Sequence, residues 1–188
     1  MKRLVAILLL LVLAVSAVSC GEAIELRGVE NYIPSTCSFG LTSNLFPSED
    51  IISMFGFEEG DYAYYDSGDR NHGYAKAFAY FRYPKDEYEV IKSQSLNTVP
   101  LMSKQYEYNG YVFSEYLCYS GTDENGVLAP QSLFPQQFNM VGYNDEERIL
   151  VFIGYFNGDP ESSERALAQT DFGAFLNAAY SEYYNFDK

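Results

Sequence analysis

The dipeptide Asn109-Gly110, between two runs of alternating aromatic residues, constrains the fold of this chain more than any other feature. Both positions of a two-residue type I′ turn need positive φ angles, and Asn-Gly adopts them readily. The flanking runs alternate as strands do when one face is buried, so residues 104–120 predict a β-hairpin. Its register pairs Tyr108 with Tyr111, Tyr106 with Phe113 and Lys104 with Glu115.

Other segments predict two further hairpins. Aromatic-rich residues 61–65 and 73–83 flank a turn-rich linker, which is typical of a hairpin, although the alanine-rich stretch YAKAFAYF leaves a helix as the alternative. Residues 137–157 indicate another hairpin, with its turn at Asn144–Glu147. The continuously apolar Ile149–Ile153 predicts a strand that is buried on both faces.

Helices are predicted at residues 46–57, at residues 84–96 and near the C-terminus. In the last helix Asp159 is the expected cap and Pro160 the first helical residue. One helical stripe contains Ala168, Phe172, Phe175, Leu176, Ala179 and Tyr183, and this helix should therefore pack on a sheet. Gly173 is expected to weaken it by about 1 kcal/mol and to mark a bend.

Hairpins in runs, with helices set apart, predict an antiparallel α+β domain. We expect two layers: a sheet of about five to six strands and a C-terminal helix packed across one face. Nothing in the sequence indicates an internal repeat or a second domain.

The first twenty residues have the organisation of an export signal. Lys2 and Arg3 precede the apolar run Leu4–Val15, and small residues follow. Twelve apolar residues lie within the range of about 7–15 for a secretory signal and below the roughly 20 that span a bilayer. The segment AVSC, followed by Gly21, resembles the lipobox of bacterial lipoprotein precursors. Cleavage after Ala17 by a general signal peptidase is the alternative.

The resemblance implies that the sulfur of Cys20 carries a diacylglyceryl group and that Cys20 begins the mature chain. Residues 1–19 are then the signal peptide, 20–34 the lipidated cysteine with a short tether, and 35–188 a single domain. Two acyl chains anchor stably, since each buried methylene contributes about 0.8 kcal/mol. The protein is expected at the outer face of the bacterial cytoplasmic membrane, or secreted if Cys20 is not lipidated.

The net charge of the chain limits the classes of partner that it is expected to bind. The sequence has 12 basic and 26 acidic residues, and without Lys2 and Arg3 it has 10 basic and 26 acidic, a net charge of −16. Nucleic acid is not an expected partner, because its binding depends on many lysine and arginine contacts. The acidity also opposes contact between the folded domain and anionic lipid.

Motifs for catalysis or cofactor binding are absent from the sequence, and no cofactor or metal is predicted. His72 is the only histidine, and with Ser67 and Asp69 it lies in a segment typical of a solvated turn. Carboxylate-pair hydrolysis remains the enzyme alternative, with Glu58, Glu59 and Asp61 as the densest acidic cluster.

Cys37 and Cys118 are a possible disulfide, with a buried thiol at Cys118 as the alternative.

Tyrosine is the unusual component, with 18 residues and no tryptophan. Between residues 74 and 83, small side chains alternate with aromatic ones, so a helix is expected to pack on the alanine face. The aromatic face would then form an exposed tyrosine surface that binds a ligand. Its predicted members are Tyr62, Tyr64, Tyr74, Tyr80, Tyr106, Tyr108 and Tyr111. The alternative is that these rings form the core.

These features favour a lipid-anchored, non-enzymatic module that binds an envelope protein or glycan. An envelope hydrolase acting on glycan or peptide is the second interpretation, and a structural lipoprotein is the third.

Overall fold

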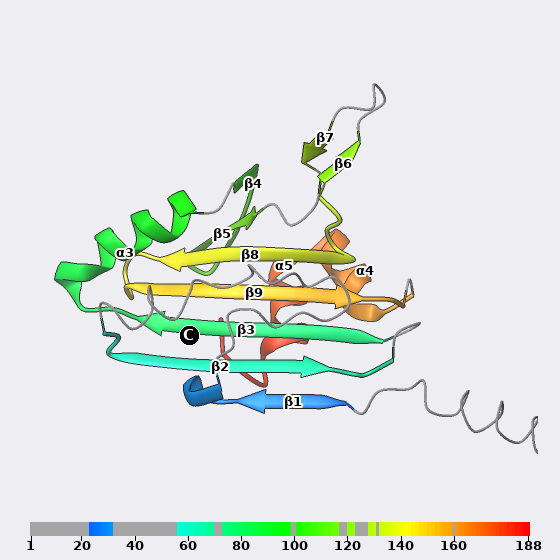
Figure 1. The fold of residues 1–188 in the computed structure, drawn as a ribbon, viewed down its shortest axis with the longest axis horizontal. Helices are drawn as coiled ribbons and strands as arrows, with labels where there is room; N and C mark the ends of the chain where they lie inside the picture. The colour runs from blue at the N-terminus through cyan, green and yellow to red at the C-terminus, as the bar shows by residue number, and fades with distance from the viewer. Residues whose placement is uncertain are drawn as a thin grey trace, which may run out of the picture.

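The computed structural model describes residues 23–31, 56–69, 73–98, 101–116, 120–122, 128–130, 132–159 and 161–188. Within them, seven antiparallel strands form one sheet in the order β1-β2-β3-β9-β8-β5-β4 (Figure 1). Its strands are β1 (Ile24–Arg27), β2 (Glu59–Asp66), β3 (Tyr74–Arg82), β4 (Leu101–Tyr108), β5 (Tyr111–Tyr116), β8 (Gln137–Asn144) and β9 (Ile149–Asn157). The α+β class is therefore confirmed, with more strands than the five to six expected.

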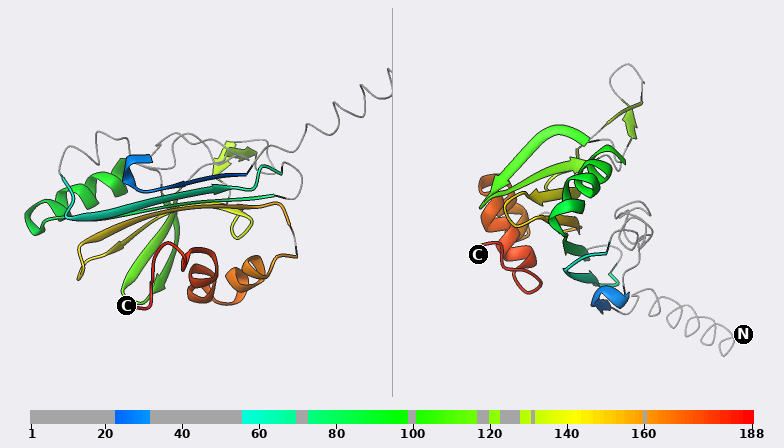
Figure 2. Two further views of the ribbon diagram at one scale, coloured as in Figure 1. Left: turned by 90° about the horizontal axis from the view of Figure 1, so that it is seen from below. Right: turned by 90° about the vertical axis from the view of Figure 1, so that its left-hand side faces the viewer.

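The helices are α3 (Lys85–Thr98), α4 (Ser163–Thr170) and α5 (Phe172–Tyr180), with a short 3-10 turn η1 (Val29–Asn31). Helices α4 and α5 lie against one face of the sheet (Figure 2). A small separate ribbon pairs β6 (Ser120–Thr122) with β7 (Leu128–Pro130).

The Asn-Gly hairpin is confirmed. Asn109 has a φ of 46° and Gly110 one of 82°. The pairs Tyr108–Tyr111 and Tyr106–Phe113 have the expected register. The expected pair of Lys104 with Glu115 is wrong, because the register shifts between Leu101 and Gln105. The Lys104 ammonium instead lies over the Tyr106 ring, 4.6 Å from its centroid.

The other two hairpins and the helix at 84–96 are also confirmed. Residues 74–82 form a strand and not a helix, because β3 bonds to β2 on one side and to β9 on the other. Residues 149–153 are 0–4% exposed and alternate between the cores on the two faces, as their continuous apolar run predicts. The helix expected at 46–57 lies almost entirely outside the described residues.

The C-terminal helix is two helices and not one. Asp171 ends α4 and caps α5, where its carboxylate accepts a hydrogen bond from the backbone of Ala174 at 3.2 Å. The cap of α4 is Ser162 and not Asp159, whose carboxylate instead accepts a bond from the Glu161 backbone at 2.9 Å. The helical bend expected at Gly173 therefore lies two residues earlier.

The sheet begins inside the predicted tether. Strand β1 starts at Ile24, four residues after Cys20, and pairs along the outer edge of β2. The first strand of the sheet therefore lies before residue 35, the predicted start of the domain.

The sheet has an apolar core on each face. The face under α4 and α5 is dominated by rings, among them Phe78, Phe113, Phe138, Phe175, Tyr180 and Phe186, all of which are 0–1% exposed. The opposite face contains alanines and rings, among them Tyr62, Tyr64, Ala77, Phe81, Tyr83 and Phe152.

Candidate functional site

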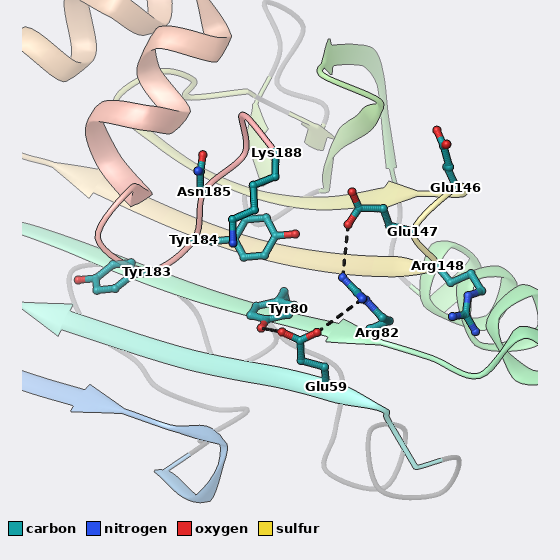
Figure 3. A pocket seen from close by; sticks show the side chains of 10 residues that line it. All are labelled: Glu59, Tyr80, Arg82, Glu146, Glu147, Arg148, Tyr183, Tyr184, Asn185 and Lys188. Atoms are coloured by element: carbon teal, nitrogen blue, oxygen red, sulfur yellow. Dashed lines mark hydrogen bonds and ion pairs between the residues drawn. The ribbon is translucent and has the colours of Figure 1, made fainter.

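A pocket of about 600 Å³ lies between one end of the sheet and the segment that follows α5 (Figure 3). We name it the Arg82 pocket. Its charged lining residues are Glu59, Glu146, Glu147, Arg82, Arg148 and Lys188. Tyr80, Tyr183, Tyr184 and Asn185 complete the lining.

Strand register brings the charged groups together. Glu59 at the start of β2 pairs with Arg82 at the end of β3, and Arg82 also pairs with Ile149 at the start of β9. The turn before β9 therefore delivers Glu147 and Arg148 to the same end of the sheet. These residues are far apart in the sequence and adjacent only across the strands.

The Arg82 guanidinium lies between two carboxylates. Its Nη2 donates a hydrogen bond to Glu147 Oε2 at 3.4 Å, and its Nη1 is 3.7 Å from Glu59 Oε2 (Figure 3). The contact with Glu59 is an ion pair too long for a hydrogen bond, so Nη1 retains donors for a ligand. A cation bound to both acids is a poor arrangement for hydrolysis, where the two carboxylates must flank the scissile bond.

Two tyrosines supply the apolar part of the pocket. The Tyr80 hydroxyl donates to Glu59 Oε1 at 2.8 Å, and the ring centroids of Tyr80 and Tyr184 are 4.7 Å apart. Burial, and next the bond to Glu59, raises the pKa of Tyr80, so its hydroxyl is a proton donor at neutral pH. The Tyr184 hydroxyl shares a 2.7 Å hydrogen bond with Tyr111. Both hydroxyls are thus engaged by the protein.

The second guanidinium is also held by protein oxygens. Arg148 has a φ of 59° in the turn before β9. It donates to the backbone carbonyl of Tyr83 at 3.0 Å and to Glu58 Oε2 at 3.2 Å. The arginines are therefore positioned in advance, and each already has an acidic partner.

The predicted tyrosine surface is not one surface. Tyr62 and Tyr64 are 0% and 2% exposed and lie in the core on the alanine face. Tyr80, Tyr106, Tyr108 and Tyr111 lie on the opposite face. Tyr74 is half-buried, and its ring stacks on Tyr65 with 5.0 Å between centroids.

The cause of this correction is that α4, α5 and the last residues cover the aromatic face and not the alanine face. Large rings on both layers interlock there, for example Phe78 with Tyr180 and Phe186. For most of the predicted rings the structure fits the core alternative. Among the seven, Tyr80 lines the pocket.

Other predicted residues lie outside the described residues: Cys20, Cys37, Cys118 and His72. Of the predicted acidic cluster, Glu59 lines the Arg82 pocket, and Glu58 contacts Arg148, which also lines it. Sequence reasoning missed both arginines. The available signal was a charged residue at the end of a buried strand or directly beside one: Arg82 ends β3, and Arg148 precedes β9.

A buried lysine joins the sheet to the helices elsewhere. Lys76 is 7% exposed, and its ammonium donates to the backbone carbonyl of Ala179 near the end of α5 at 3.0 Å. It also lies 3.8 Å from Glu164, which accepts a 2.7 Å bond from the Tyr155 hydroxyl. This network fixes α4 and α5 on the sheet.

A buried acid lies on β5. Glu115 is 4% exposed and accepts a 2.7 Å hydrogen bond from Ser132. Burial raises its pKa, while the bond from Ser132 and the charge of Lys104 act in the opposite direction. Within the part of the chain that the structure describes, no cluster of metal-ligating side chains occurs.

No known protein family, curated protein or solved structure matches this chain. Among the described helices, none has the length and apolar character needed to cross a bilayer. The features of this chain that bear on function are the antiparallel α+β fold, the Arg82 pocket and the N-terminal sequence.

Proposed function

We propose that this chain is a lipid-anchored lipoprotein of the bacterial cell envelope that acts as a non-enzymatic binding module, with the Arg82 pocket as its binding site. The observation that carries the proposal is the arrangement within this pocket. Glu59, Arg82 and Glu147 form one linked group beside two aromatic rings. Concave sites with a few fixed polar groups and aromatic walls are typical of ligand recognition.

Anchoring through Cys20 is inferred from the lipobox-like segment AVSC, and the position of β1 shows what it would mean for the sheet. Only three residues separate Cys20 from Ile24, so their Cα atoms are at most about 14 Å apart at roughly 3.6 Å per residue. The sheet would be held close to the bilayer, while the net charge of −16 opposes its adsorption to anionic lipid.

The anchor is tested by feeding radiolabelled palmitate to cells that express the full chain. We expect label in the protein, recovery in the membrane fraction, and loss of both in Cys20→Ser. Unchanged labelling and membrane retention in Cys20→Ser would refute the anchor.

The absence of catalysis is tested separately. The membrane-extracted protein is incubated with glycan and peptide fractions of the envelope, and the products are analysed by mass spectrometry. We expect no cleavage. Cleavage products that disappear with Glu59→Gln would replace the binding module with the hydrolase interpretation.

A further inference from the structure

We propose that the Arg82 pocket binds a neutral, hydroxyl-rich glycan. This inference rests on the proposed function as an envelope binding module and names the ligand class. Three features carry it: the charge balance of the lining, the tyrosine rings and the position of the pocket in the sheet.

The pocket is balanced in charge although the chain is strongly acidic. Three acidic and three basic side chains line it, and those three are drawn from 10 basic residues outside the signal. Sites for phosphate or carboxylate ligands use arginines that are free to form paired hydrogen bonds. Here Arg82 and Arg148 already contact Glu59, Glu147 and Glu58. An anionic ligand would be repelled by these neighbouring carboxylates, whereas a neutral one would not.

Hydroxyl groups suit this lining because they donate and accept hydrogen bonds. Carboxylates of Glu59 and Glu147 accept from a hydroxyl, and the Nη1 of Arg82 donates to one. Bonds to charged groups are about twice as strong as neutral ones, so a hydroxyl-rich ligand gains from each.

The rings supply the other half of sugar recognition. A pyranose has an apolar face of C–H groups, and aromatic rings offer an apolar surface of similar size. The hydroxyls of Tyr80 and Tyr184 are bonded to Glu59 and Tyr111, so the rings are fixed in place. Tyr80 is only 8% exposed, so one sugar unit contacts mainly the half-buried Tyr184 ring with its face and the charged groups with its edge.

The location of the pocket favours a glycan over a lipid headgroup. Ile24 pairs with Asp66 at the far end of β2, while Glu59 begins that strand. Seven residue steps at about 3.3 Å place the pocket end about 23 Å from the end nearest the anchor. The pocket therefore lies at the end of the sheet away from Ile24, and so away from the proposed anchor at Cys20.

The test is isothermal titration of the membrane-extracted protein, in detergent micelles, with neutral oligosaccharides of glucose, N-acetylglucosamine, galactose and mannose. We expect at least one to bind, with less than about a twofold change in Kd between low and high salt, because a neutral ligand is not screened. Glu59→Gln and Tyr184→Ala should each weaken binding about tenfold or more. Lys104→Ala, which removes an exposed cation on β4 outside the pocket, should bind as the wild type does.

Three results would overturn the inference: no binding by any of these sugars, binding that weakens steeply with salt and is displaced by inorganic phosphate, or equal binding by Glu59→Gln and Tyr184→Ala. Glu59→Gln retains an acceptor for the Tyr80 hydroxyl, so it tests the site even if Tyr184→Ala unfolds. Palmitate labelling of Cys20 does not involve the pocket. A failure of the lipid-anchor proposal can therefore be distinguished from a failure of the glycan proposal.

Discussion

Replacing Gly173 with alanine should destabilise this protein, although the same change normally strengthens a helix. Gly173 is the second residue of α5, and a Cβ added there would lie closer than 3.0 Å to three ring atoms of Tyr108. The Tyr108 ring is held in this position because its hydroxyl bonds to Asp187 and accepts from Asn177 at 3.1 Å. Packing of the Tyr108 ring against α5 therefore requires glycine at position 173.

Two opposing contributions set the magnitude. Glycine to alanine in a helix gains up to about 1 kcal/mol. Inserting a methyl group into a filled site costs about 1–3 kcal/mol. We expect the free energy of unfolding of Gly173→Ala to fall by about 1–2 kcal/mol, which lowers Tm by about 2–8 °C for a chain of this size.

The decisive measurement is a double-mutant cycle with Tyr108→Ala, followed by urea and thermal unfolding with circular dichroism. Without the ring, Gly173→Ala should become stabilising by up to about 1 kcal/mol. The coupling free energy between the two positions should therefore be about 1–3 kcal/mol. A stabilising effect of Gly173→Ala in the wild type, or the same effect in both backgrounds, would refute the packing argument.

Three further predictions concern buried polar groups. Lys76→Met should lower the free energy of unfolding by roughly 1–3 kcal/mol, because the Ala179 carbonyl loses its hydrogen-bond donor and Glu164 loses its ion-pair partner; a change below about 0.5 kcal/mol in urea unfolding would contradict this. The raised pKa of Glu115 means that the native state retains a proton that the unfolded state releases, so stability falls as pH rises from the ordinary value of 4.5 towards the raised pKa. Glu115→Gln should remove that fall, and denaturation curves at stepped pH with an unchanged slope would exclude the explanation. Burial raises the pKa of Tyr83 and Tyr111, so stability should decrease as pH rises above 10, and tyrosinate absorbance should increase together with unfolding. Ionisation of most tyrosines in a protein that stays folded would show that the rings are accessible.

Local chemistry made the hairpins predictable. The positive φ angles of the turn are a property of Asn109 and Gly110 alone, and they fix the register next to the turn, as far as Gln105 and Ser114. The apolar run at residues 149–153 likewise predicts its own position, because only a strand inside the sheet buries side chains on both faces. The helix break was harder to predict because Asp171 competes with its own helix by capping the next one.

Alternation in a strand shows that two faces differ, but it does not show which face a distant helix will cover. The aromatic side of β3 was therefore expected at the surface, whereas α5 and the chain after it bury Phe78 and most of Tyr80. The Arg82 pocket could not be predicted from the sequence for a related reason. Arg82 and Glu147 meet only because β3 and β9 are neighbours, and nothing near either residue in the sequence indicates that pairing.

The pairing of β3 with β9 affects the rate at which this chain folds. Ala77 of β3 lies beside Gly154 of β9. The middle of the sheet therefore joins two segments that are far apart in the sequence. Closing such a loop costs conformational entropy before any contact offsets it, so folding slows as the sequence separation of the contacts increases. Until residues 149–157 are available, β3 presents an unpaired edge that another chain can join. Truncation before β9 should yield aggregates, and not a smaller folded unit.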